Sequence, residues 1–499
     1  MMRDRDHSLP VNPLLRELLG DHADPAHAVH WNRDGRLHYR DRTGAPRQAP
    51  LPWHELGEYA RSFQHTYWKE WSTHLRGRRV IVEHTSINPV HPMHLGALRS
   101  TLIGGSLARL LRSAGAEVRV HYFVNDHGRQ VVLLDWIMAR TRTRAIPPGM
   151  RFDTAAGVLY ALVNMVLGER AADIERLTAA HPWLDRAVPP ELRDPVALRA
   201  RLADPTDPRP GFVDRMVDLA VADMGLVHAE VDHFERESAV TGPLDSLLHE
   251  LLAEHPAVAV NGTWCLRRPD GLVPVARANG SSLYFLRDVA NSLARDPAAD
   301  LMLHVIGDDQ TLLQRALRDV LAARGRTSEH VAFGTIHDRG RKFSSRQNRL
   351  ITVAEVDRED ADRLASTALE MMLRRPRRAL DVGALTGRPH RRVAEALELA
   401  SHGTGVGPEA GLPHPAAREL ATALLRSLGA AHGALHLRSP HPLARYLVDL
   451  ATAYRRAARA GAVPPWAREW FLHTHEQVSG LLGLRADRSH DTAGSVRAA

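Results

Sequence analysis

The feature that most constrains the fold is a succession of strand, loop, helix and strand patterns near the start of the chain. A β-branched run, Val80–Val82, is followed by the chain-breaking pair Asn88-Pro89. Helical apolar spacing then extends from Leu98 to Leu111, and a second apolar run covers Val118 to Val124. Because two strands joined through a helix form a βαβ unit, the pattern predicts a parallel sheet covered by helices.

The remaining patterns divide the chain into parts. A helix is expected over 53–75, before the βαβ unit, and helices interrupted by proline are expected after it. Strand-like alternation over 256–287 then precedes another buried strand, LMLHVIGDD. Beyond a Gly-rich joint, three amphipathic segments are typical of a small helical bundle. We therefore predict an α/β fold with a short N-terminal domain (1–75), a parallel-sheet domain (76–355) with a helical insertion at about 140–241, a helical connector (356–407), a helical bundle (408–484) and a flexible tail (485–499).

Composition narrows the class of protein. The 499 residues include 44% hydrophobic and 25% charged residues, which fits a soluble, cored protein of several domains. The net charge of +7 weakly favours a polyanionic partner such as nucleic acid. The single cysteine, Cys265, excludes a disulfide framework and a Cys-based zinc site. With no signal peptide and no run near ~18 apolar residues, we expect a cytoplasmic protein without membrane association.

The first candidate motif is Pro92-Met93-His94-Leu95-Gly96-Ala97, at the predicted strand-to-helix turn. Gly96 would let a nucleotide approach the backbone, and the free amides of the first helical turn favour phosphate. His94 could donate a hydrogen bond to a phosphate oxygen as charge develops during attack on the α-phosphate. For an isolated H-x-G, a surface histidine in a His-rich chain is the commoner explanation.

The second candidate motif is marked by a rare residue. All but two of the 65 basic residues are arginine, and the exceptions are Lys69 and Lys342. Lys342 lies in Arg341-Lys342-Phe343-Ser344-Ser345-Arg346, where an ammonium and two hydroxyls suit a pentavalent phosphoryl transition state. A solvated basic turn is the usual alternative, but a lysine that resists the arginine bias favours function. No role is assigned to Lys69.

These two segments resemble the HIGH and KMSKS signatures of class I aminoacyl-tRNA synthetases, and in more detail the arginyl-tRNA synthetases. Five stretches carry the resemblance: VIVEHTSINPVHPMHLGALRSTLIG, VHYFVNDHGRQV, ARANGSSLYFLRDVANSLAR, VIGDDQTLLQRAL and RKFSSRQNRLITVAEV. The segment HPLARYLVDLATAYRRA is similar to that family's anticodon-binding domain. The resemblance covers about residues 75 to 484. It implies a Rossmann-like catalytic domain with a helical insertion, followed by an all-α anticodon-binding-like bundle.

The resemblance also implies site residues. Tyr284 and Asp288 match the family's pair for the substrate guanidinium, and a carboxylate suits a planar cationic fork. Taken singly, such residues are more often core aromatics or helix caps, but their joint occurrence reverses that preference. The other implied arginine-binding residues are Glu83, Ser86, Asn88, Asp126 and Gln310; those implied for ATP are His94, Gly96, Lys342, Ser344, Ser345 and Arg346, with His94 and Lys342 catalytic.

The implied activity is that of an arginine–tRNA ligase, which activates arginine with ATP as an adenylate and transfers it to tRNA. ATP is therefore expected, with Mg²⁺ accompanying the nucleotide and no dedicated protein ligands for a metal. The expected partners are arginine and an arginine-accepting tRNA, and the expected state is a monomer.

Several departures from the family pattern keep alternatives open. Ala97 replaces the second histidine of HIGH, and a lost transition-state hydrogen bond can cost ~3 kcal/mol, or about a hundredfold in rate. His91 stands where many arginyl enzymes have lysine, Ser345 replaces the second lysine of KMSKS, and Leu399–Gly403 replaces a Tyr-Ala-His-Ala-Arg segment. With its short N-terminal domain, the chain resembles a divergent member. One alternative is a paralogue that adenylates arginine or a guanidino analogue and passes it to a non-tRNA amine; another is an inactive tRNA-binding regulator.

Overall fold

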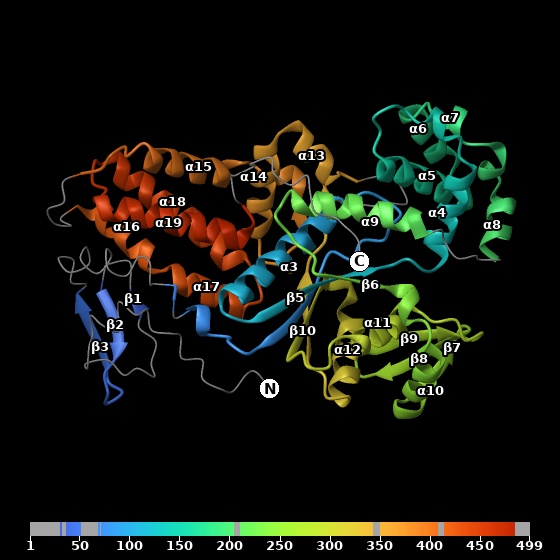
Figure 1. Ribbon diagram of the computed structural model, residues 1–499, viewed down its shortest axis with the longest axis horizontal. Coiled ribbons are helices and arrows are strands. Elements are labelled where there is room, and N and C mark those ends of the chain that lie inside the picture. The colour runs from blue at the N-terminus through green and yellow to red at the C-terminus, as the bar shows by residue number, and fades with distance from the viewer. Residues whose placement is uncertain are drawn as a thin grey trace.

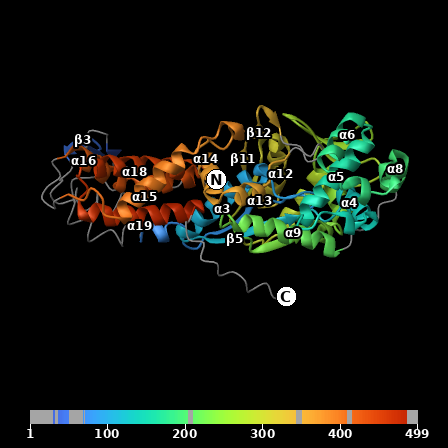
Figure 2. The same ribbon diagram turned by 90° about the horizontal axis from the view of Figure 1, so that it is seen from above.

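The computed structural model describes residues 30–31, 36–50, 68–69, 71–203, 210–342, 350–407 and 414–484. Figure 1 shows an elongated molecule with a sheet in the middle, the C-terminal helices at one end and the helices of residues 129–225 at the other. The view from above has the same order of parts (Figure 2). The predicted tail at 485–499 and most of the predicted helix at 53–75 lie outside the described residues.

The central sheet has five parallel strands in the order β11-β10-β4-β5-β6. This is the strand order of doubly wound nucleotide-binding folds, and its winding reverses between β4 and β10. Ligands of such sheets bind outside the carboxyl ends of the strands at this point. The Rossmann-like prediction is therefore confirmed. The strands are β4 (Arg79–Glu83), β5 (Glu117–Val124), β6 (His233–Arg236), β10 (Leu301–Gly307) and β11 (Ser328–Phe333).

Both faces of the sheet are covered, because alternate residues of each strand enter different cores. Val80 and Val82 of β4 pack into the larger core with helix α3, while Ile81 packs into a smaller core. The smaller core is formed with the helices α10 (Leu244–Glu254), α11 (Tyr284–Ala294) and α12 (Thr311–Ala323).

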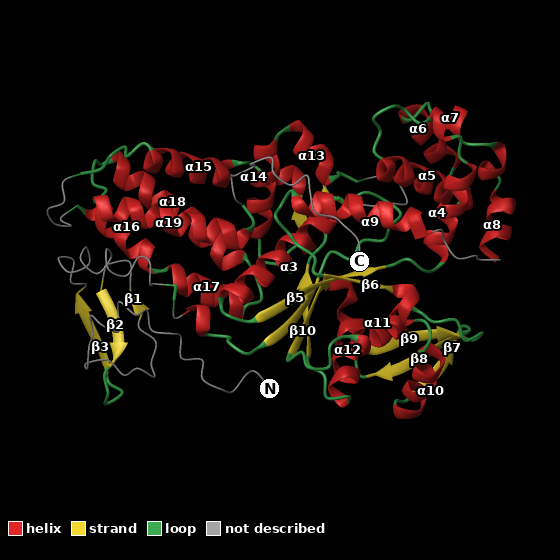
Figure 3. Ribbon diagram, in the orientation of Figure 1, coloured by secondary structure: helices red, strands yellow, loops and turns green. Residues whose placement is uncertain are grey.

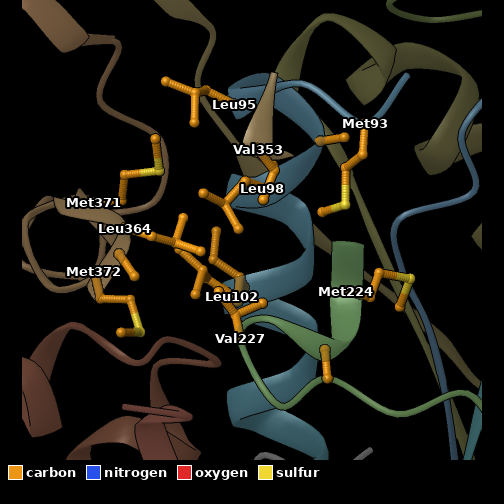
Figure 4. Close-up of a cluster of buried hydrophobic side chains, with 14 of the residues drawn as sticks. Met93, Leu95, Leu98, Leu102, Met224, Val227, Val353, Leu364, Met371 and Met372 are labelled. Carbon is orange, nitrogen blue, oxygen red and sulfur yellow. The ribbon is translucent and has the colours of Figure 1, made fainter. Parts of the chain in front are cut away.

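Helix α3 (Leu95–Ser113) is the predicted crossover from β4 to β5 and lies at the centre of the larger core. Its residues Leu98 and Leu102 pack against Val353, Leu364 and two methionines from later helices (Figure 4). The helix lies close to β4 because Gly104 has no side chain; a Cβ there would be 2.4 Å from the His84 ring. This close packing fixes the start of α3, which carries the first motif, relative to the end of β4.

The segment between β5 and β6 is helical, as predicted for the insertion. It comprises α4 (Arg129–Arg140), α5 (Phe152–Leu167), α6 (Ala171–Ala180), α7 (Leu184–Ala187), α8 (Pro195–Ala203) and α9 (Pro210–Gly225), with two short 3-10 turns, η3 (Thr143–Ala145) and η4 (Pro190–Arg193). Strand β6 falls within the stretch assigned to the insertion by sequence, yet it pairs with β5 as an edge strand. Its four residues, HFER, are half-buried or exposed, so no apolar run marks it.

The strand-like alternation predicted over 256–287 corresponds to a separate antiparallel sheet beside α11 and α12, and not to strands of the central parallel sheet (Figure 3). The strands of this antiparallel sheet are β7 (Ala257–Val260), β8 (Thr263–Arg268) and β9 (Gly271–Arg277). Two 3-10 turns, η5 (Glu237–Val240) and η6 (Asp308–Gln310), follow β6 and β10.

The C-terminal region is helical, and its long helices match the predicted bundle. After a small sheet of β12 (Ile336–Asp338), β13 (Arg341–Lys342) and β14 (Leu380–Asp381), the helices are α13 (Val353–Glu359), α14 (Ala361–Met372), α15 (Arg388–Ser401), α16 (Pro415–Leu425), α17 (Ser427–His436), α18 (His441–Arg459) and α19 (Pro465–Leu482), with η8 at Val382–Ala384. The N-terminal part that the structure describes has β1 (His30–Trp31), β2 (Arg36–Arg40), β3 (Pro46–Pro50) and η2 (Trp71–Thr73). The exact domain boundaries stay predictions.

Candidate active site

The turn after β4 has an uncommon backbone conformation. Thr85 has a φ of 73°, in the left-handed region that β-branched residues rarely adopt. Side chains of α3 hold it there: Ser100 Oγ accepts from Thr85 N at 3.1 Å, and Thr101 Oγ1 lies 2.8 Å from Thr85 Oγ1. Backbone strain of this kind persists where the surroundings over-determine it. It turns the chain so that Ser86 and Asn88 follow along the carboxyl edge of the sheet.

Ser86 and Asn88 connect this turn to the end of β5. Ser86 Oγ accepts from Phe123 N at 3.1 Å and lies 3.4 Å from Glu83 Oε1. Asn88 Oδ1 accepts from Asn125 Nδ2 at 2.8 Å. Each side chain thus has one firm partner and lies at the edge where the sequence assigned it to the amino-acid backbone of the substrate.

Asp126 has a different environment from the one expected for a substrate contact. Its two carboxylate oxygens accept from Ser238 N at 2.8 Å and Ser238 Oγ at 2.7 Å, and Arg236 Nη1 is 3.4 Å away. These bonds join the end of β5 to the end of β6. Asp126 therefore holds the ends of β5 and β6 together at the carboxyl edge of the sheet.

Gln310 lies at the carboxyl end of β10, directly before α12. Its amide is half-buried and makes only a long contact, 3.5 Å, with Asp309 Oδ2. Since β10 is the neighbour of β4 in the sheet, Gln310 and the Ser86 turn are on adjacent strand ends.

Glu83, the last residue of β4, is buried and already paired within the protein. Its Oε2 accepts from Arg295 Nη2 at 2.6 Å and lies 3.2 Å from His304 Nδ1. Burial alone would raise its pKa, but the charge of Arg295 and the hydrogen bond with His304 hold the pKa of Glu83 well below its usual range. Arg295 also binds Glu235, with Nη2 2.9 Å from Oε2. Arg295, Glu235 and His304 were not predicted as site residues, because they are far from Glu83 in the chain and no local pattern links them to it.

Asp288 contrasts with Glu83. It lies half-buried on the second turn of α11, and no hydrogen bond or ion pair joins its carboxyl to any residue that the structure describes. Burial, reinforced by the negative charges of Glu83 and Glu237, raises the pKa of Asp288 to about 8, although Arg287 and Arg295 oppose the shift. A carboxyl in this setting requires a cation to be stable as the charged form.

Tyr284 begins the same helix, four residues before Asp288, and is 56% exposed. The Arg287 guanidinium lies 4.9 Å from the centre of its ring and forms an ion pair with the buried Glu237, with 2.5 Å between Nε and Oε1. Burial raises the pKa of Glu237 to about 7, with Arg287 opposing and Asp126 adding to the shift. Glu237 and Arg287 were not predicted as site residues. If β6 had been recognised in the sequence, Glu237 and Ser238, which follow it directly, would have been placed at the carboxyl edge of the sheet.

His94 is the N-terminal cap of α3. Its Nδ1 accepts from Gly96 N at 3.0 Å and from Ala97 N at 3.3 Å. Burial, together with the nearby His91, lowers the pKa of His94 to about 3, so the ring is neutral near pH 7. Because Nδ1 accepts, the proton of the neutral ring is on Nε2, which is a donor. Gly96 is needed locally, since a Cβ there would be 2.7 Å from the ring carbon Cε1.

The first motif pairs through its main chain with residues that follow the second motif in the sequence. Leu95 N donates to Ile351 O at 3.0 Å, and Val353 N donates to Met93 O at 2.9 Å. Lys342 is in β13, where its backbone pairs with His337. Ser344, Ser345 and Arg346 lie outside the described residues.

Other features of the described part bear on what the site can bind. A pocket of about 330 Å³ adjoins the signature turn and is lined by Pro92, Arg151, Thr352 and Arg358, among others. Within the same ranges there is no group of three or more His, Cys, Asp or Glu side chains that could hold a metal ion, and Cys265 is buried. None of the described helices combines the length and apolarity needed to cross a membrane.

Residues 66–150 match the protein family described as tRNA synthetases class I (R), catalytic domain. The arginine–tRNA ligase of Saccharolobus solfataricus is 27% identical over 341 residues, which cover 56% of this chain and 55% of that protein. The arginine–tRNA ligase of Methanothermobacter thermautotrophicus is 31% identical over 247 residues, or 48% of this chain and 40% of that protein. The chain spans about half the length of the curated relatives it matches.

Solved structures extend the similarity over more of the chain. The arginyl-tRNA synthetase of Thermus thermophilus superposes with a TM-score of 0.64 at 22% identity, covering 89% of this chain and 87% of that one. The arginyl-tRNA synthetase of Plasmodium falciparum gives a TM-score of 0.60 at 14% identity, covering 89% and 84%. At such identities the likeness establishes the fold. The chain is therefore related to the arginine–tRNA ligases and has the class I fold of the arginyl-tRNA synthetases, as its motifs indicated.

Proposed function

We propose that the chain is an arginine–tRNA ligase. The observation that carries this proposal is the carboxyl of Asp288, which lacks a partner among the described residues and lies under the negative charges of Glu83 and Glu237. A bound cation relieves that repulsion, and a planar guanidinium can donate two parallel hydrogen bonds to one carboxylate. Arginine is the standard amino acid with this head group, so the pocket fits its side chain.

In this proposal the exposed ring of Tyr284 lies beside the bound side chain, and the Glu83–Arg295 pair lies beneath Asp288 in the charge network. Glu83 is fully engaged by Arg295, so in our proposal it acts by fixing the negative potential that Asp288 experiences. The α-ammonium and carboxylate of the substrate would then reach Ser86, Asn88 and Gln310, which follow the ends of β4 and β10. This orientation directs the substrate carboxylate toward the crevice where the sheet reverses its winding.

ATP would bind at the turn that starts α3, beside the neutral His94 ring. The free helix amides expected from the sequence are not available there, because Leu95 N donates to Ile351 O and the amides of Gly96 and Ala97 donate to His94 Nδ1. A carboxylate oxygen of arginine attacks the α-phosphorus, the bond to the β-phosphate oxygen breaks, and pyrophosphate leaves. His94 Nε2–H can donate to the phosphate oxygens without gaining a proton, because burial keeps the ring neutral. Lys342 is proposed to stabilise the charge of the leaving pyrophosphate.

In the second step a hydroxyl of the terminal ribose of tRNA attacks the carbonyl carbon of arginyl-adenylate, and AMP leaves. Mg²⁺ would arrive with the ATP phosphates. We also propose that the chain acts as a monomer in the cytoplasm, where ATP and tRNA are available. Three exposed large apolar side chains, Val260, Trp264 and Leu272, share the sheet β7–β9, while others of the described residues, such as Val196 and Leu437, lie singly on distant elements.

The direct test is ATP–pyrophosphate exchange and aminoacylation with arginine, with citrulline as the matched control. Citrulline has nearly the same shape but an uncharged urea in place of the guanidinium. We expect exchange and tRNA charging with arginine and none with citrulline. Equal exchange with both amino acids would contradict the charge-based pocket, while tRNA binding without exchange would identify an inactive tRNA-binding regulator.

One observation favours a second candidate for the acceptor. Ala97 stands where the signature has its second histidine, and its N–H is used to bind His94 Nδ1. A site that lacks this side chain could belong to a paralogue that passes arginine, or a guanidino analogue such as canavanine, to a small amine. Exchange that is equally fast with and without tRNA, together with failure to charge tRNA, would support this candidate over the first.

A further inference from the structure

A second basic feature, outside the candidate active site, is the loop Arg374-Arg375-Pro376-Arg377-Arg378 between α14 and β14. All four arginines of this arginine loop are exposed. In the ranges that the structure covers, none of their guanidinium groups has a hydrogen bond or an ion pair. By contrast, Arg455 and Arg459 of the adjacent bundle both pair with Glu395, and Arg456 pairs with Glu419.

The backbone of the arginine loop is firmly attached to the catalytic domain. Pro376 O accepts from Gly334 N at 2.8 Å, directly after the carboxyl end of β11, and Arg375 O accepts from Arg99 Nη2 at 3.3 Å. Arg99 is buried and also donates through Nη1 to Gly334 O at 2.8 Å. A Cβ on Gly334 would be 2.7 Å from Arg377 O, so the glycine is what lets the loop approach this closely. The four charges are therefore presented on a fixed backbone.

The arginine loop lies near the start of α18 in the C-terminal bundle, where Arg445 is itself paired with Asp449. The charges of Arg375 and Arg445 both act on His441 at the start of α18, and that of Arg377 acts on His330 of β11. In both cases burial is the larger cause of the lowered histidine pKa, and the arginines add to it. The loop thus lies at the junction between the catalytic sheet and the bundle, next to α14 in Figure 1.

We propose that the arginine loop binds the sugar–phosphate backbone of tRNA where it passes from the bundle to the catalytic domain. Unpaired guanidinium groups on a fixed backbone suit successive phosphates, because each phosphate accepts two hydrogen bonds from one guanidinium and releases its counterions. The inference rests on the proposed function, which makes tRNA the polyanion that this chain must hold. In this proposal the arginine loop contacts tRNA and raises the affinity for it, and it takes no part in the catalytic steps.

The test uses the variant R374Q/R377Q/R378Q of the full chain, with tRNA affinity measured between 50 and 300 mM salt. We expect Kd at ~150 mM salt to rise about tenfold to a hundredfold, and the slope of log Kd against log salt to fall by about 2. The KM values for arginine and ATP, measured with saturating tRNA, should not change. The variant R374K/R377K/R378K keeps the charge and should retain most of the affinity and slope.

A matched control removes the same charge elsewhere. Arg142, Arg144 and Arg186 are exposed, and their guanidinium groups have no hydrogen bond or ion pair with any described residue. They lie near η3 and α7, at the opposite end of the molecule from the bundle. R142Q/R144Q/R186Q should change the salt slope less than the loop variant does. Equal effects of the two triple variants would overturn the proposal, because they would reflect net charge alone.

Two further outcomes separate the inference from the proposed function. If the wild type binds tRNA and the loop variant has the same slope of log Kd against log salt, the inference is overturned and the proposed function is left intact. Absence of tRNA binding by the wild type would overturn both. Thermal unfolding of each variant checks that its fold is retained, and a selective loss of binding to anionic vesicles, with tRNA binding unchanged, would reassign the loop to a lipid surface and so overturn the proposal.

Discussion

The two sides of the carboxyl edge satisfy their charges in different ways. At the nucleotide side, the turn that starts α3 is closed on itself, with His94 neutral and its Nδ1 bound to the helix amides. At the guanidinium side, carboxyl groups outnumber guanidinium groups, and one carboxyl has no partner among the described residues. The carboxyls are Glu83, Asp126, Glu235, Glu237 and Asp288; the guanidiniums are Arg236, Arg287 and Arg295.

This difference indicates which side of the carboxyl edge needs its substrate to balance its charges. The nucleotide side is preorganised, since its groups are bound and neutral before ATP arrives, and such dipoles need no reorganisation during reaction. The guanidinium side lacks one positive charge, because the ionised form of Asp288 is destabilised by desolvation and a bound cation would stabilise it. Substitutions at the two sides should therefore separate binding of arginine from the rate of activation.

The largest effect is expected for Asp288→Asn. Removal of one partner from a half-buried ion pair should weaken arginine binding by about a thousandfold, corresponding to about 4 kcal/mol. ATP affinity should stay within about twofold of wild type. Equilibrium dialysis with labelled arginine measures the first quantity, and a fluorescent ATP analogue measures the second.

The control for this substitution is Asp245→Asn, on the exposed surface of α10. It removes the same charge from the same chemical group and should leave arginine affinity unchanged. If Asp288→Asn kept wild-type arginine affinity, the assignment of the guanidinium to this carboxyl would be wrong.

The next largest effect concerns the activation rate. Lys342→Ala should lower the rate of adenylate formation about a hundredfold, because a charge that acts on the transition state is lost. Arginine affinity should be nearly unchanged. Single-turnover measurement of pyrophosphate release gives the rate directly. Lys69→Ala is the natural control, as Lys69 is the other lysine of the chain and is exposed; equal rates for the two variants would make Lys342 an ordinary basic residue.

The sequence predicted the parts of the site that are local. The run Val80–Val82 and the spacing of α3 indicated the strand, turn and helix. The alternation over 256–287 wrongly placed Tyr284 in a strand, whereas Tyr284 begins α11, the helix that also carries Asp288. Each of these patterns depends on neighbours within one or two turns of chain, where periodicity and capping act.

The charge partners could not be predicted in the same way. Arg295 meets Glu83 across 212 positions of sequence, and His304 meets it across 221. Such pairs are set by the strand order β10-β4-β5-β6, which places four strand ends in one row. Strand β6, which brings Glu235 and Glu237 to this row, is short and half-exposed, so it left no apolar pattern. Knowledge of the topology was needed to see that Glu83 is paired and Asp288 is not.

A smaller effect is expected from pH, and its sign follows from Asp288. The pKa of this carboxyl is raised from 3.8 to about 8, and a guanidinium binds its ionised form. Below pH 8 arginine binding must release a proton, so arginine affinity should rise about tenfold per pH unit up to that value and then level off. Isothermal titration in buffers of different ionisation enthalpy measures the released proton. In Asp288→Asn the residual affinity should lose this dependence; persistence of the same profile would assign it to Glu237 instead.

The raised pKa of Asp288 also affects the stability of the fold, which should fall with rising pH while arginine affinity rises. A carboxyl whose folded pKa is raised stabilises the fold while it is protonated, fully below about pH 3.8, and this contribution is lost as pH rises through about 8. At pH 8 without arginine, Asp288→Asn should therefore be more stable than wild type by about 1–2 kcal/mol, after allowance for solvent screening. Urea unfolding at pH 5 and pH 8 gives the difference, and a variant that is less stable than wild type at pH 8 would contradict the strained carboxyl.

The smallest effect is expected at the preorganised side. In Gly96→Ala the new Cβ would lie 2.7 Å from His94 Cε1, so the ring must move by a few tenths of an ångström or lose its bonds to the amides of Gly96 and Ala97. Since the His94 cap satisfies helix amides, we expect a loss of about 1 kcal/mol in stability and a several-fold lower activation rate. Gly105→Ala, farther along α3, is the control, because its Cβ would meet only Ala229 Cβ and the flexible Arg109 at 3.3 Å or more. If Gly96→Ala changed arginine affinity instead of the activation rate, the two sides of the edge would be coupled rather than separate, and the division of labour between them would have to be abandoned.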